Sequence, residues 1–526
     1  MMRQTTMVTL FTLTLLGAAH AATPKDTLVV AKNIEDIVGL DPAEAFEFSS
    51  AEVVSNVYQN LIQYDVKNPN KVVPGLADSW TVAADGKSIT FQLKPSAHFA
   101  SGNDVRPEDV LFSFMRVVKL NKAPAFILAQ LGWTPDNIGQ MVRKTGNDSV
   151  TISWSGDFGA AFVLNLLAAR PGSILDEKLV TQHQKGADLG NAWLNQNSAG
   201  SGPYKLKLYK PKEVVVLEAN TTTPVGAPAT RMVLIKNVVE PATQRLLLES
   251  GDADIARDLG PDQLTAMKAR ADIRVETYPQ AAVHFISFNQ KQEKLRNPAV
   301  WEAMRYLVDY DGIANRLLKG QMKVHQAFLP EGFPGALKET PFKYDPEKAK
   351  AILSKAGVKD LSFDMDVINA PRFMDMAQSL QASMAKGGVK LNLLSGTGSQ
   401  VITRYRARKH EAIMLYWGPD FFDPHANAKA FAYNVDNSDG NYQSTTTWRN
   451  AWAVPQLSSK TMTALKEKDP TARATAYQDL QRDVQQSSPI VVMFQEQSQV
   501  ALRSNVKGYI NGLTPDFVLY DKVVKQ

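Results

Sequence analysis

In the second half of the chain, segments with helical spacing of apolar residues alternate with short apolar runs of strand type. The helical segments are residues 297–307, 346–356 and 374–385, and the strand-like runs are residues 389–394 and 412–415. Alternation of this kind is compatible with an α/β fold, in which helices pack against a sheet. The sequence therefore predicts α/β organisation for this half of the protein.

Both ends of the chain contribute further predicted elements. Residues 27–32 predict a first strand, because they form a short apolar run. Ser49 or Ser50 can cap a helix that runs through residues 53–61 with helical spacing. Near the C-terminus, residues 489–494 predict a buried strand. The predicted sheet therefore draws on distant parts of the sequence.

Residues 1–21 are predicted to be a secretory signal that does not belong to the fold. Arg3 gives a positive start, residues 7–17 are mostly apolar, and residues 19–21 supply a small-x-small cleavage pattern. A transmembrane helix needs roughly 20 apolar residues, and this run is shorter. We expect the mature chain to begin at Ala22.

The sequence contains no cysteine. An exported chain of this composition is therefore expected to lack disulfides, thiolate nucleophiles and thiolate metal ligands. It also has no cysteine to carry a lipid anchor, which suits a freely soluble protein of the periplasm. The formal net charge is +5 over 526 residues, with both signs interspersed. This distribution predicts neither nucleic-acid binding nor a basic membrane patch.

A shaped loop with one carboxylate among aromatic rings follows the strand-like run at 412–415. From residue 415 to 424 it reads Leu-Tyr-Trp-Gly-Pro-Asp-Phe-Phe-Asp-Pro. Gly and Pro break regular structure, and a carboxylate among aromatic rings is unfavourable unless a cation pairs with it. The ammonium group of a ligand is one candidate partner for Asp420; the alternative is a loop over the core in which Asp420 caps the next turn. Asp423, before a proline, is typical of a turn.

Several blocks of sequence, in a fixed order, resemble one known family. The first block combines residues 74–80, 85–86, 91–94, 99 and 108–113; the later blocks are 200–204, 251–255, 288–289 with 295–298, 305–313, 344–349 and 489–492. Together they resemble the bacterial family 5 extracellular solute-binding proteins, the periplasmic receptors of dipeptide, oligopeptide and nickel ABC transporters. The resemblance spans nearly the whole mature chain. It departs at Ser201, where Thr is common, and at residues 95–97, which replace a more basic stretch.

The resemblance implies a two-lobe α/β periplasmic-binding-protein fold of the cluster C type, with an extra domain inserted in the first lobe. Two crossing segments would join the lobes. On this pattern, lobe I comprises residues 22–60, 196–275 and 490–526, the inserted domain is 61–195, and lobe II is 276–489.

The resemblance also implies a non-enzymatic, monomeric receptor without a cofactor. It would capture short peptides between its lobes and deliver them to the permease and ATPase subunits of a membrane ABC importer. Other cargoes of this fold are an opine, a murein peptide, an oligosaccharide or a metal chelate. From other classes, a secreted hydrolase and a chaperone-like holder of unfolded segments remain as alternatives. The chain has no Gly-x-Ser-x-Gly elbow and no visible nucleophile–base pair, which disfavours the hydrolase.

In the peptide-binding branch of this family, an aspartate in a Trp/Gly/Asp pattern pairs with the α-amino group of the ligand. The resemblance assigns this role to Asp420, although Pro419 departs from the common order. Trp417 and Tyr416 would give flat apolar walls. Because a strand directs successive side chains to opposite faces, only one of the two points inward, and we expect it to be Trp417.

A zwitterionic ligand also needs a cation for its carboxylate. The cationic contacts of the family come from a segment well before the aspartate, which makes Arg372 the candidate; a solvated arginine is the alternative. Arg449, after a polar loop, is a further candidate.

Phe46 and Glu47 could line a cleft, although the aromatic residues at this point could equally be core. His425 could touch a ligand, but we expect it to be exposed. The seven histidines lack metal-ligand spacing, so no metal site is predicted.

Overall fold

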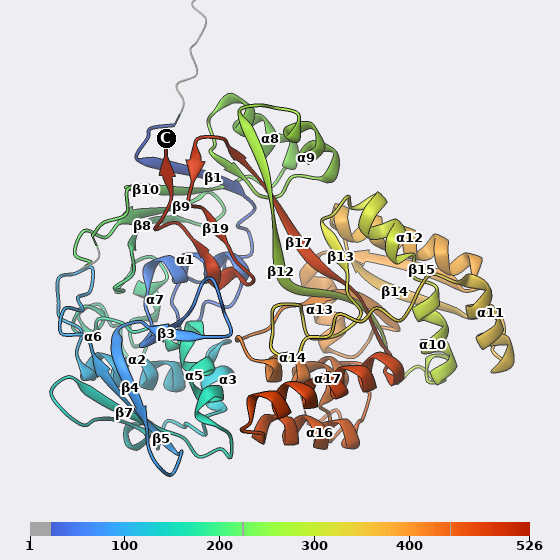
Figure 1. The fold of residues 1–526 in the computed structure, drawn as a ribbon, viewed down its shortest axis with the longest axis horizontal. Helices are drawn as coiled ribbons and strands as arrows, with labels where there is room; N and C mark the ends of the chain where they lie inside the picture. Colours follow the sequence, from blue (N-terminus) through green and yellow to red (C-terminus); the bar gives the residue numbers. More distant parts are fainter. Residues whose placement is uncertain (1–22, 224–225, 442) are drawn as a thin grey trace, which may run out of the picture.

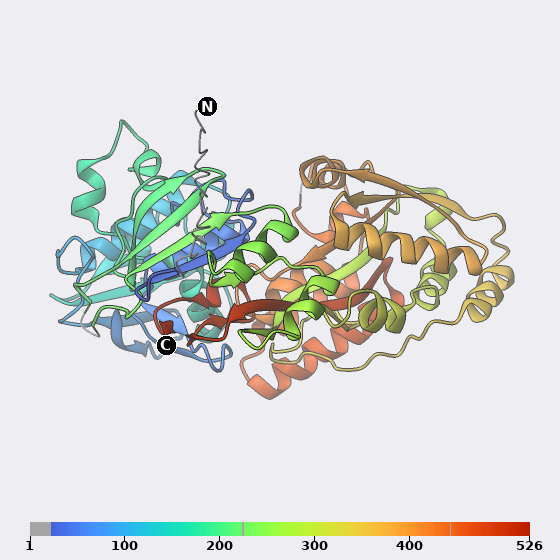
Figure 2. The same ribbon diagram turned by 90° about the horizontal axis from the view of Figure 1, so that it is seen from above.

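The computed structural model describes residues 23–223, 226–441 and 443–526. The predicted signal at residues 1–21 and the predicted start of the mature chain lie outside these ranges. The described chain forms two α/β lobes side by side, and two long antiparallel strands run from one lobe into the other (Figure 1 and Figure 2). These crossing strands are β12 (Ile273–Phe288) and β17 (Ile490–Arg503). They are the central strands of an 11-stranded sheet that both lobes share.

The first lobe contains one half of this sheet and the C-terminus. Its strands are β1 (Thr27–Lys32), β8 (Tyr204–Lys210), β9 (Val214–Ala219), β10 (Met232–Asn237) and β11 (Ile255–Ala256). Its helices are α1 (Phe48–Val57), α8 (Pro241–Ser250) and α9 (Pro261–Lys268). The C-terminal segment adds β18 (Val506–Lys507), β19 (Ile510–Asn511), η4 (Pro515–Phe517), β20 (Val518–Leu519) and β21 (Val524–Lys525). Because β1 is parallel to both β10 and β11, the carboxyl ends of all three strands meet at one edge.

Between β1 and β8 the chain forms an additional domain around a four-stranded sheet of order β4-β5-β7-β6. Its strands are β2 (Ile62–Tyr64), β3 (Val72–Pro74), β4 (Ala77–Val82), β5 (Ser88–Leu93), β6 (Val142–Lys144) and β7 (Ser149–Ser153). Its helices are α2 (Pro107–Leu120), α3 (Ala125–Ala129), α4 (Ile138–Met141), α5 (Ala160–Ala168), η1 (Arg170–Gly172), α6 (Glu177–Gln182) and α7 (Asn191–Leu194). We refer to it below as the inserted domain.

The second lobe contains the other half of the large sheet. Its strands are β13 (Met322–Val324), β14 (Ser362–Ile368), β15 (Lys390–Gly396) and β16 (Ala412–Trp417). Its helices are η2 (Glu293–Leu295), α10 (Pro298–Tyr306), η3 (Gly312–Leu317), α11 (Pro346–Lys355), α12 (Pro371–Lys386), α13 (Gly398–Arg406), α14 (Pro424–Ala432), α15 (Thr446–Arg449), α16 (Pro455–Lys466) and α17 (Pro470–Ser487). The residue boundaries of the predicted lobes stay a prediction.

The pairing of β12 with β17 is irregular where the two strands pass between the lobes. Pro279 pairs with Gln497, and the next pair is Val283 with Gln495, so that three residues of β12 face the single residue Glu496. An irregularity of this kind bends the strands and redirects side chains. Side chains at the irregular crossing can therefore face the space between the lobes.

The lobes also touch each other away from the crossing strands. The ring of Phe421, from the loop after β16, packs edge-on against Phe162 of the inserted domain at 5.8 Å between centroids. Tyr64 of the inserted domain lies 5.7 Å from the ring of Phe422, and Asn165 Nδ2 donates to Asp423 Oδ2 at 3.1 Å. The second lobe therefore contacts the inserted domain directly.

The local predictions agree with these elements except at α1: the helix predicted to run through residue 61 ends at Val57, and its predicted cap also differs. The predicted strands at 27–32, 389–394, 412–415 and 489–494 correspond to β1, β15, β16 and β17, and the three predicted helices correspond to α10, α11 and α12. The cap predicted at Ser49 or Ser50 is wrong, because α1 already begins at Phe48 and Glu47 occupies the cap position. Instead, the amide of Ser49 donates to Asp36 at 2.9 Å.

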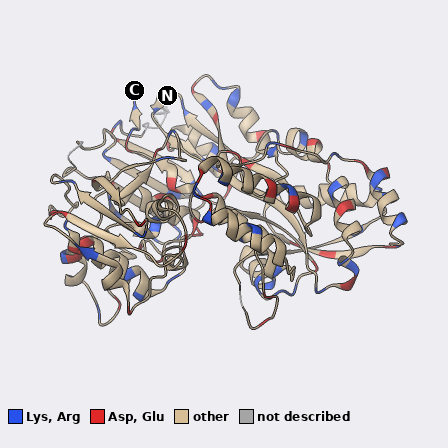
Figure 3. Cartoon of the chain, turned by 60° about the horizontal axis from the view of Figure 1, so that its bottom comes forward, with Lys and Arg blue, Asp and Glu red and all other residues tan. Residues whose placement is uncertain are grey.

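Lys and Arg positions are interspersed with Asp and Glu positions throughout the ribbon (Figure 3). Of the helices in the described ranges, none has the length and apolar character that crossing a membrane requires.

Candidate ligand-binding site

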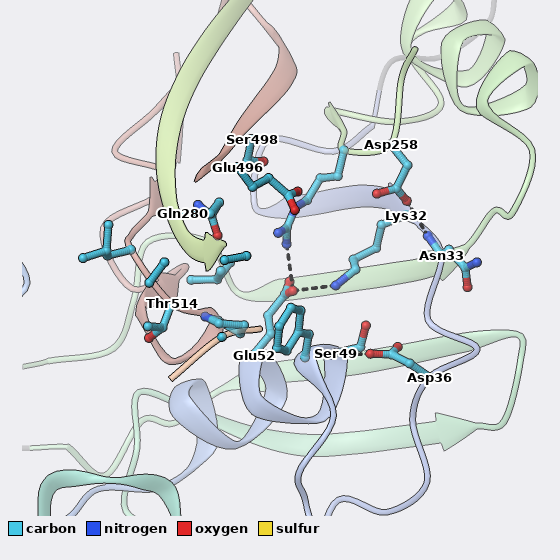
Figure 4. A pocket seen from close by; sticks show the side chains of 18 of the residues that line it. Lys32, Asn33, Asp36, Ser49, Glu52, Asp258, Gln280, Glu496, Ser498 and Thr514 are labelled. Carbon is cyan, nitrogen blue, oxygen red and sulfur yellow. Dashed lines mark hydrogen bonds and ion pairs between the residues drawn. The ribbon is translucent and has the colours of Figure 1, made fainter. Parts of the chain in front are cut away.

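A cavity of about 360 Å³ lies between the two lobes, beside the irregular crossing of β12 and β17. The first lobe contributes the loop after β1, the first turns of α1 and the segment before η4. The second lobe contributes Arg372, at the start of α12, together with Gly418 and Pro419, which follow β16. Charged and polar side chains from separate segments converge on this space (Figure 4). Its size is that of a small-molecule pocket.

Glu52 is a buried carboxylate in the first-lobe wall of the cavity, with 1% of its surface exposed. Lys32 Nζ and Arg257 Nη1 each donate to its Oε2 at 2.7 Å, and Tyr520 Oη donates to Oε1. Lys32 and Arg257 meet here because they lie at the carboxyl ends of the parallel neighbours β1 and β11. Burial raises the pKa of Glu52, but Arg257 and Lys32 outweigh this effect and lower it to about 2. Glu52 is therefore ionised and holds two cations.

Glu496 holds Arg372 on the other side of the cavity. Arg372 Nη1 donates to Glu496 Oε1 at 2.7 Å, and His284 Nε2 lies 3.3 Å from the second carboxylate oxygen. Burial raises the pKa of Glu496, but Arg372 and His284 together bring it well below its ordinary value. Within the described part of the chain, Nη1 is the only nitrogen of Arg372 with a hydrogen-bond partner. The guanidinium is thus fixed at one end and open at the other.

Arg170, from η1 of the inserted domain, closes the cavity near the C-terminal segment. Its Nε donates to Asp516 Oδ1 at 2.6 Å, and its Nη1 donates to the carbonyl oxygens of Ala45 and Phe46 at 3.2 Å. Both Arg170 and Asp516 line the cavity. The ion pair ties the inserted domain to the first lobe.

Asp420 lies one residue beyond the cavity wall that Gly418 and Pro419 form. Its side chain is partly exposed, and it has no hydrogen bond or ion pair with any described residue. Burial raises its pKa to about 6, although Arg170, Arg449 and Lys429 act in the opposite direction from a greater distance. Asp420 does not cap the next turn, because Asp423 is the N-cap of α14. Asp420 is therefore a carboxylate that lacks a close cation.

The two aromatic residues before this loop differ from the expected arrangement. Tyr416 is 37% exposed and its ring lies 6.0 Å from that of Phe48, across the gap between the lobes. Trp417 instead packs against Phe431 inside the second lobe. Neither lines the cavity itself, and the expectation that Trp417 faces inward and Tyr416 away is wrong. The cause is the strand register: Tyr416 pairs with His284 and stacks on it.

Arg449 and His425 are buried inside the second lobe. Arg449 is 8% exposed, and its guanidinium lies over the rings of Tyr405 and Trp417 at 5.3 and 5.7 Å. His425 is 2% exposed, so the expectation of an exposed histidine is wrong. Its ring packs against Phe162 of the inserted domain, and burial lowers its pKa to about 3. Neither residue lines the cavity.

Phe46 and Glu47 lie close to the cavity without lining it, whereas the next residue, Phe48, does line it. The ring of Phe46 packs against Phe126 at 6.1 Å. Glu47 is partly buried, and burial raises its pKa. Of the predicted site residues, only Arg372 therefore lines the cavity directly.

Most of the charged residues around the cavity were not predicted from the sequence. They are Lys32, Glu35, Asp36, Glu52, Arg170, Arg257, Asp258, Glu496 and Asp516. Lys32 could have been found from the sequence, because it is the single charged residue at the end of an apolar strand. The remaining residues come from separate segments and share no motif. Among the described residues, no group of three or more His, Cys, Asp or Glu is placed to hold a metal ion.

A sheet shared by two lobes, two crossing strands and a charged cavity between the lobes define a two-lobe binding protein. Residues 71–439 match the family described as bacterial extracellular solute-binding proteins, family 5 Middle. The chain belongs to this family of non-catalytic solute-binding proteins.

Individual relatives and solved structures agree with this assignment. The chain is 30% identical to the probable D,D-dipeptide-binding periplasmic protein DdpA of Escherichia coli K12, over 96% of this chain and 95% of that protein. The periplasmic binding protein DppA of Helicobacter pylori, solved with the peptide STSA, superposes with a TM-score of 0.78 at 21% identity, covering 95% and 98% of the two chains. MoaA of A. tumefaciens R10, solved with mannopinic acid, gives a TM-score of 0.80 at 20% identity, covering 96% and 100%. These superpositions establish the cluster C fold of periplasmic binding proteins.

Proposed function

We propose that this chain is the periplasmic substrate-binding protein of an ABC importer and that it captures short peptides, from di- to oligopeptides. The observation that carries the proposal is Asp420, a carboxylate beside the cavity that has no close cation among the described residues. A charge in this position is unfavourable until a cation reaches it. The α-ammonium group of a peptide supplies that cation.

Arg372 is the proposed partner of the ligand carboxylate. Arg372 lines the cavity, Glu496 pairs with its Nη1, and its Nη2 and Nε have no hydrogen-bond partner among the described residues. A guanidinium with two adjacent free N–H groups can bind a carboxylate in a bidentate manner. Asp420 and Arg372 would then hold the two ends of a zwitterion, while Tyr416 and Phe48 provide apolar surface at the rim.

Transport would follow from closure of the lobes. A ligand that contacts both lobes stabilises the closed form over the open one, and the permease and ATPase subunits of the importer would recognise the closed form. The packing of Phe421 on Phe162 joins the second lobe to the inserted domain and would stabilise the closed form. We propose that the protein acts as a monomer after export to the periplasm, with the leader predicted at residues 1–21.

Two related proteins support a peptide cargo, because DdpA is a probable D,D-dipeptide-binding protein and DppA was solved with a peptide. The mannopinic-acid complex of MoaA belongs to a protein of the same fold with another cargo. An opine, a murein peptide, an oligosaccharide or a metal chelate is therefore the alternative cargo class. Mass spectrometry of the small molecules that copurify with the protein distinguishes these classes.

Calorimetry with three forms of one peptide tests the proposed contacts. We expect Ala-Ala to bind and N-acetyl-Ala-Ala to lose about a hundredfold in affinity, because leaving the carboxylate of Asp420 without a cation costs up to about 3 kcal/mol. Ala-Ala-amide should also lose affinity, since it has no carboxylate for Arg372. Asp420→Asn should reproduce the loss seen on acetylation, whereas the control Asp26→Asn, at a side chain that is 47% exposed and pairs within the first lobe with Arg231, should not. If no member of a di- to pentapeptide set gives heat, the peptide assignment is refuted.

A further inference from the structure

We infer that the cargo carries a second positive charge, so that the site selects peptides with a basic side chain over neutral or acidic ones. This inference rests on the proposed function. It starts from the balance of charges around the cavity: the lining contains four cations and six carboxylates, a formal charge of −2. The cations are Lys32, Arg170, Arg257 and Arg372, and the carboxylates are Glu35, Asp36, Glu52, Asp258, Glu496 and Asp516.

All four cations are already paired within the chain. Glu52 accepts from both Lys32 and Arg257 at 2.7 Å. Arg372 is paired with Glu496 at 2.7 Å, and Arg170 with Asp516 at 2.6 Å. Three carboxylates thus suffice for the four cations, and the other three, Glu35, Asp36 and Asp258, have no ion pair with any described residue. The surplus charge of the cavity is therefore negative and lies on the first lobe.

Asp36 and Asp258 are exposed residues whose carboxylates are held in place by hydrogen bonds. Asp36 Oδ2 accepts the backbone N–H of Ser49 at 2.9 Å. Asp258 Oδ2 accepts the backbone N–H of Asn33 at 2.7 Å and the side-chain amide of Gln244 at 3.1 Å. In each carboxylate this leaves the second oxygen available to a ligand. Fixed acceptors lose less entropy when they bind a cation than mobile ones do.

The position of these two carboxylates suits a ligand side chain rather than a ligand terminus. Figure 4 shows both on the side of the pocket formed by the loop that carries Asn33. They belong to the first lobe, whereas Asp420 and Arg372, the proposed contacts of the peptide termini, belong to the second lobe. A zwitterionic backbone held by Asp420 and Arg372 carries no net charge. It would therefore leave the formal charge of −2 on the cavity lining unchanged. A Lys or Arg side chain directed to the first lobe would neutralise it and bridge the two lobes.

A matched peptide series tests this selection. Calorimetry on the full-length mature protein would use di- and tripeptides of alanine in which one position is lysine, norleucine or glutamate. Norleucine keeps the lysine stem and lacks its ammonium group. We expect lysine to bind about tenfold more tightly than norleucine in at least one position, the size of one charge-assisted contact, and glutamate to bind most weakly.

Substitutions on the first lobe locate the effect. Asp36→Asn and Asp258→Asn should each lower the lysine-to-norleucine ratio of affinities, and the double variant should bring it close to one. Asp26→Asn, at a half-exposed carboxylate of the same lobe outside the cavity, should leave the ratio as in wild type. Equal affinity for lysine and norleucine in wild type, or an unchanged ratio in the double variant, overturns the inference while the peptide function stands. Absence of binding by every peptide overturns both. The wild-type series needs no variant to fold.

Discussion

Replacing Asp420 by asparagine should make the ligand-free protein more stable at neutral pH. Asp420 has no hydrogen bond or ion pair with a described residue, so the substitution breaks no contact. Burial raises its pKa to about 6 from an ordinary value of 3.8. Asparagine has nearly the same shape and lacks the charge that burial disfavours. A residue kept for binding rather than for folding is expected to behave in this way.

The size of the effect follows from the pKa. The difference of about two units corresponds to up to about 3 kcal/mol, at about 1.4 kcal/mol per unit. Because the folded-state pKa is the higher one, the wild type takes up a proton on folding between about pH 4 and pH 6. The cost of the ionised group is therefore complete above pH 6 and disappears as the pH falls through this window. For roughly 500 residues with an unfolding entropy of about 2.1 cal/mol/K each, 3 kcal/mol corresponds to about 3 °C in Tm.

Differential scanning calorimetry of the two proteins, freed of bound ligand and compared from pH 8 to pH 4, measures this directly. The asparagine variant should melt about 3 °C higher at pH 8, and the two melting temperatures should converge toward pH 4. Asp423→Asn, in the same loop, should have the opposite sign, because Asp423 caps α14 and pairs with Arg473 at 2.7 Å. Lower stability of Asp420→Asn at pH 7, or a difference that does not shrink on acidification, would refute the reasoning.

Three further predictions concern binding, the first-lobe wall and closure. Wild-type affinity for a peptide with a free amino terminus should fall about tenfold from pH 7 to pH 5, because only ionised Asp420 binds an ammonium group, and calorimetry should find no such slope in Asp420→Asn. Glu52→Gln should destabilise the protein by about 3–5 kcal/mol in calorimetric melting, because it leaves Lys32 and Arg257 without their carboxylate. Phe421→Ala should weaken peptide binding and increase the radius of gyration in small-angle X-ray scattering, because the closed form loses its packing on Phe162; unchanged scattering and affinity would contradict a role in closure.

Elements with a clear local pattern could be predicted from the sequence. The strand at β1 and the helices α10, α11 and α12 follow from apolar spacing within short windows, which depends on no distant residue. Family resemblance supplied the two-lobe fold, which local spacing cannot give. The isolated carboxylate at Asp420 could also be predicted, because its Gly-Pro and aromatic neighbours are all local.

The parts of the site that depend on distant residues could not be predicted. Alternation along β16 indicates that Tyr416 and Trp417 point to opposite faces, but which face meets the other lobe depends on the pairing with β12. Arg372 and Glu496 are 124 residues apart and meet only because the crossing strands are irregular at Glu496. Lys32 and Arg257 likewise meet because β1 and β11 are parallel neighbours. His425 is buried because the inserted domain covers it with Phe162.

The loop after β16 can couple ligand binding to closure of the lobes, because adjacent residues in it contact the cavity and the inserted domain. Gly418 and Pro419 form part of the cavity wall, and Phe421 packs into the hydrophobic core of the inserted domain. Asp420 stands between them, so a ligand that draws this carboxylate toward the cavity acts on a segment attached to the other lobe. Deleting the contact of Phe421 should therefore weaken binding even for ligands that never touch that ring. By the same linkage, ligand that stabilises Asp420 in its ionised form should also stabilise the packing of Phe421 on Phe162.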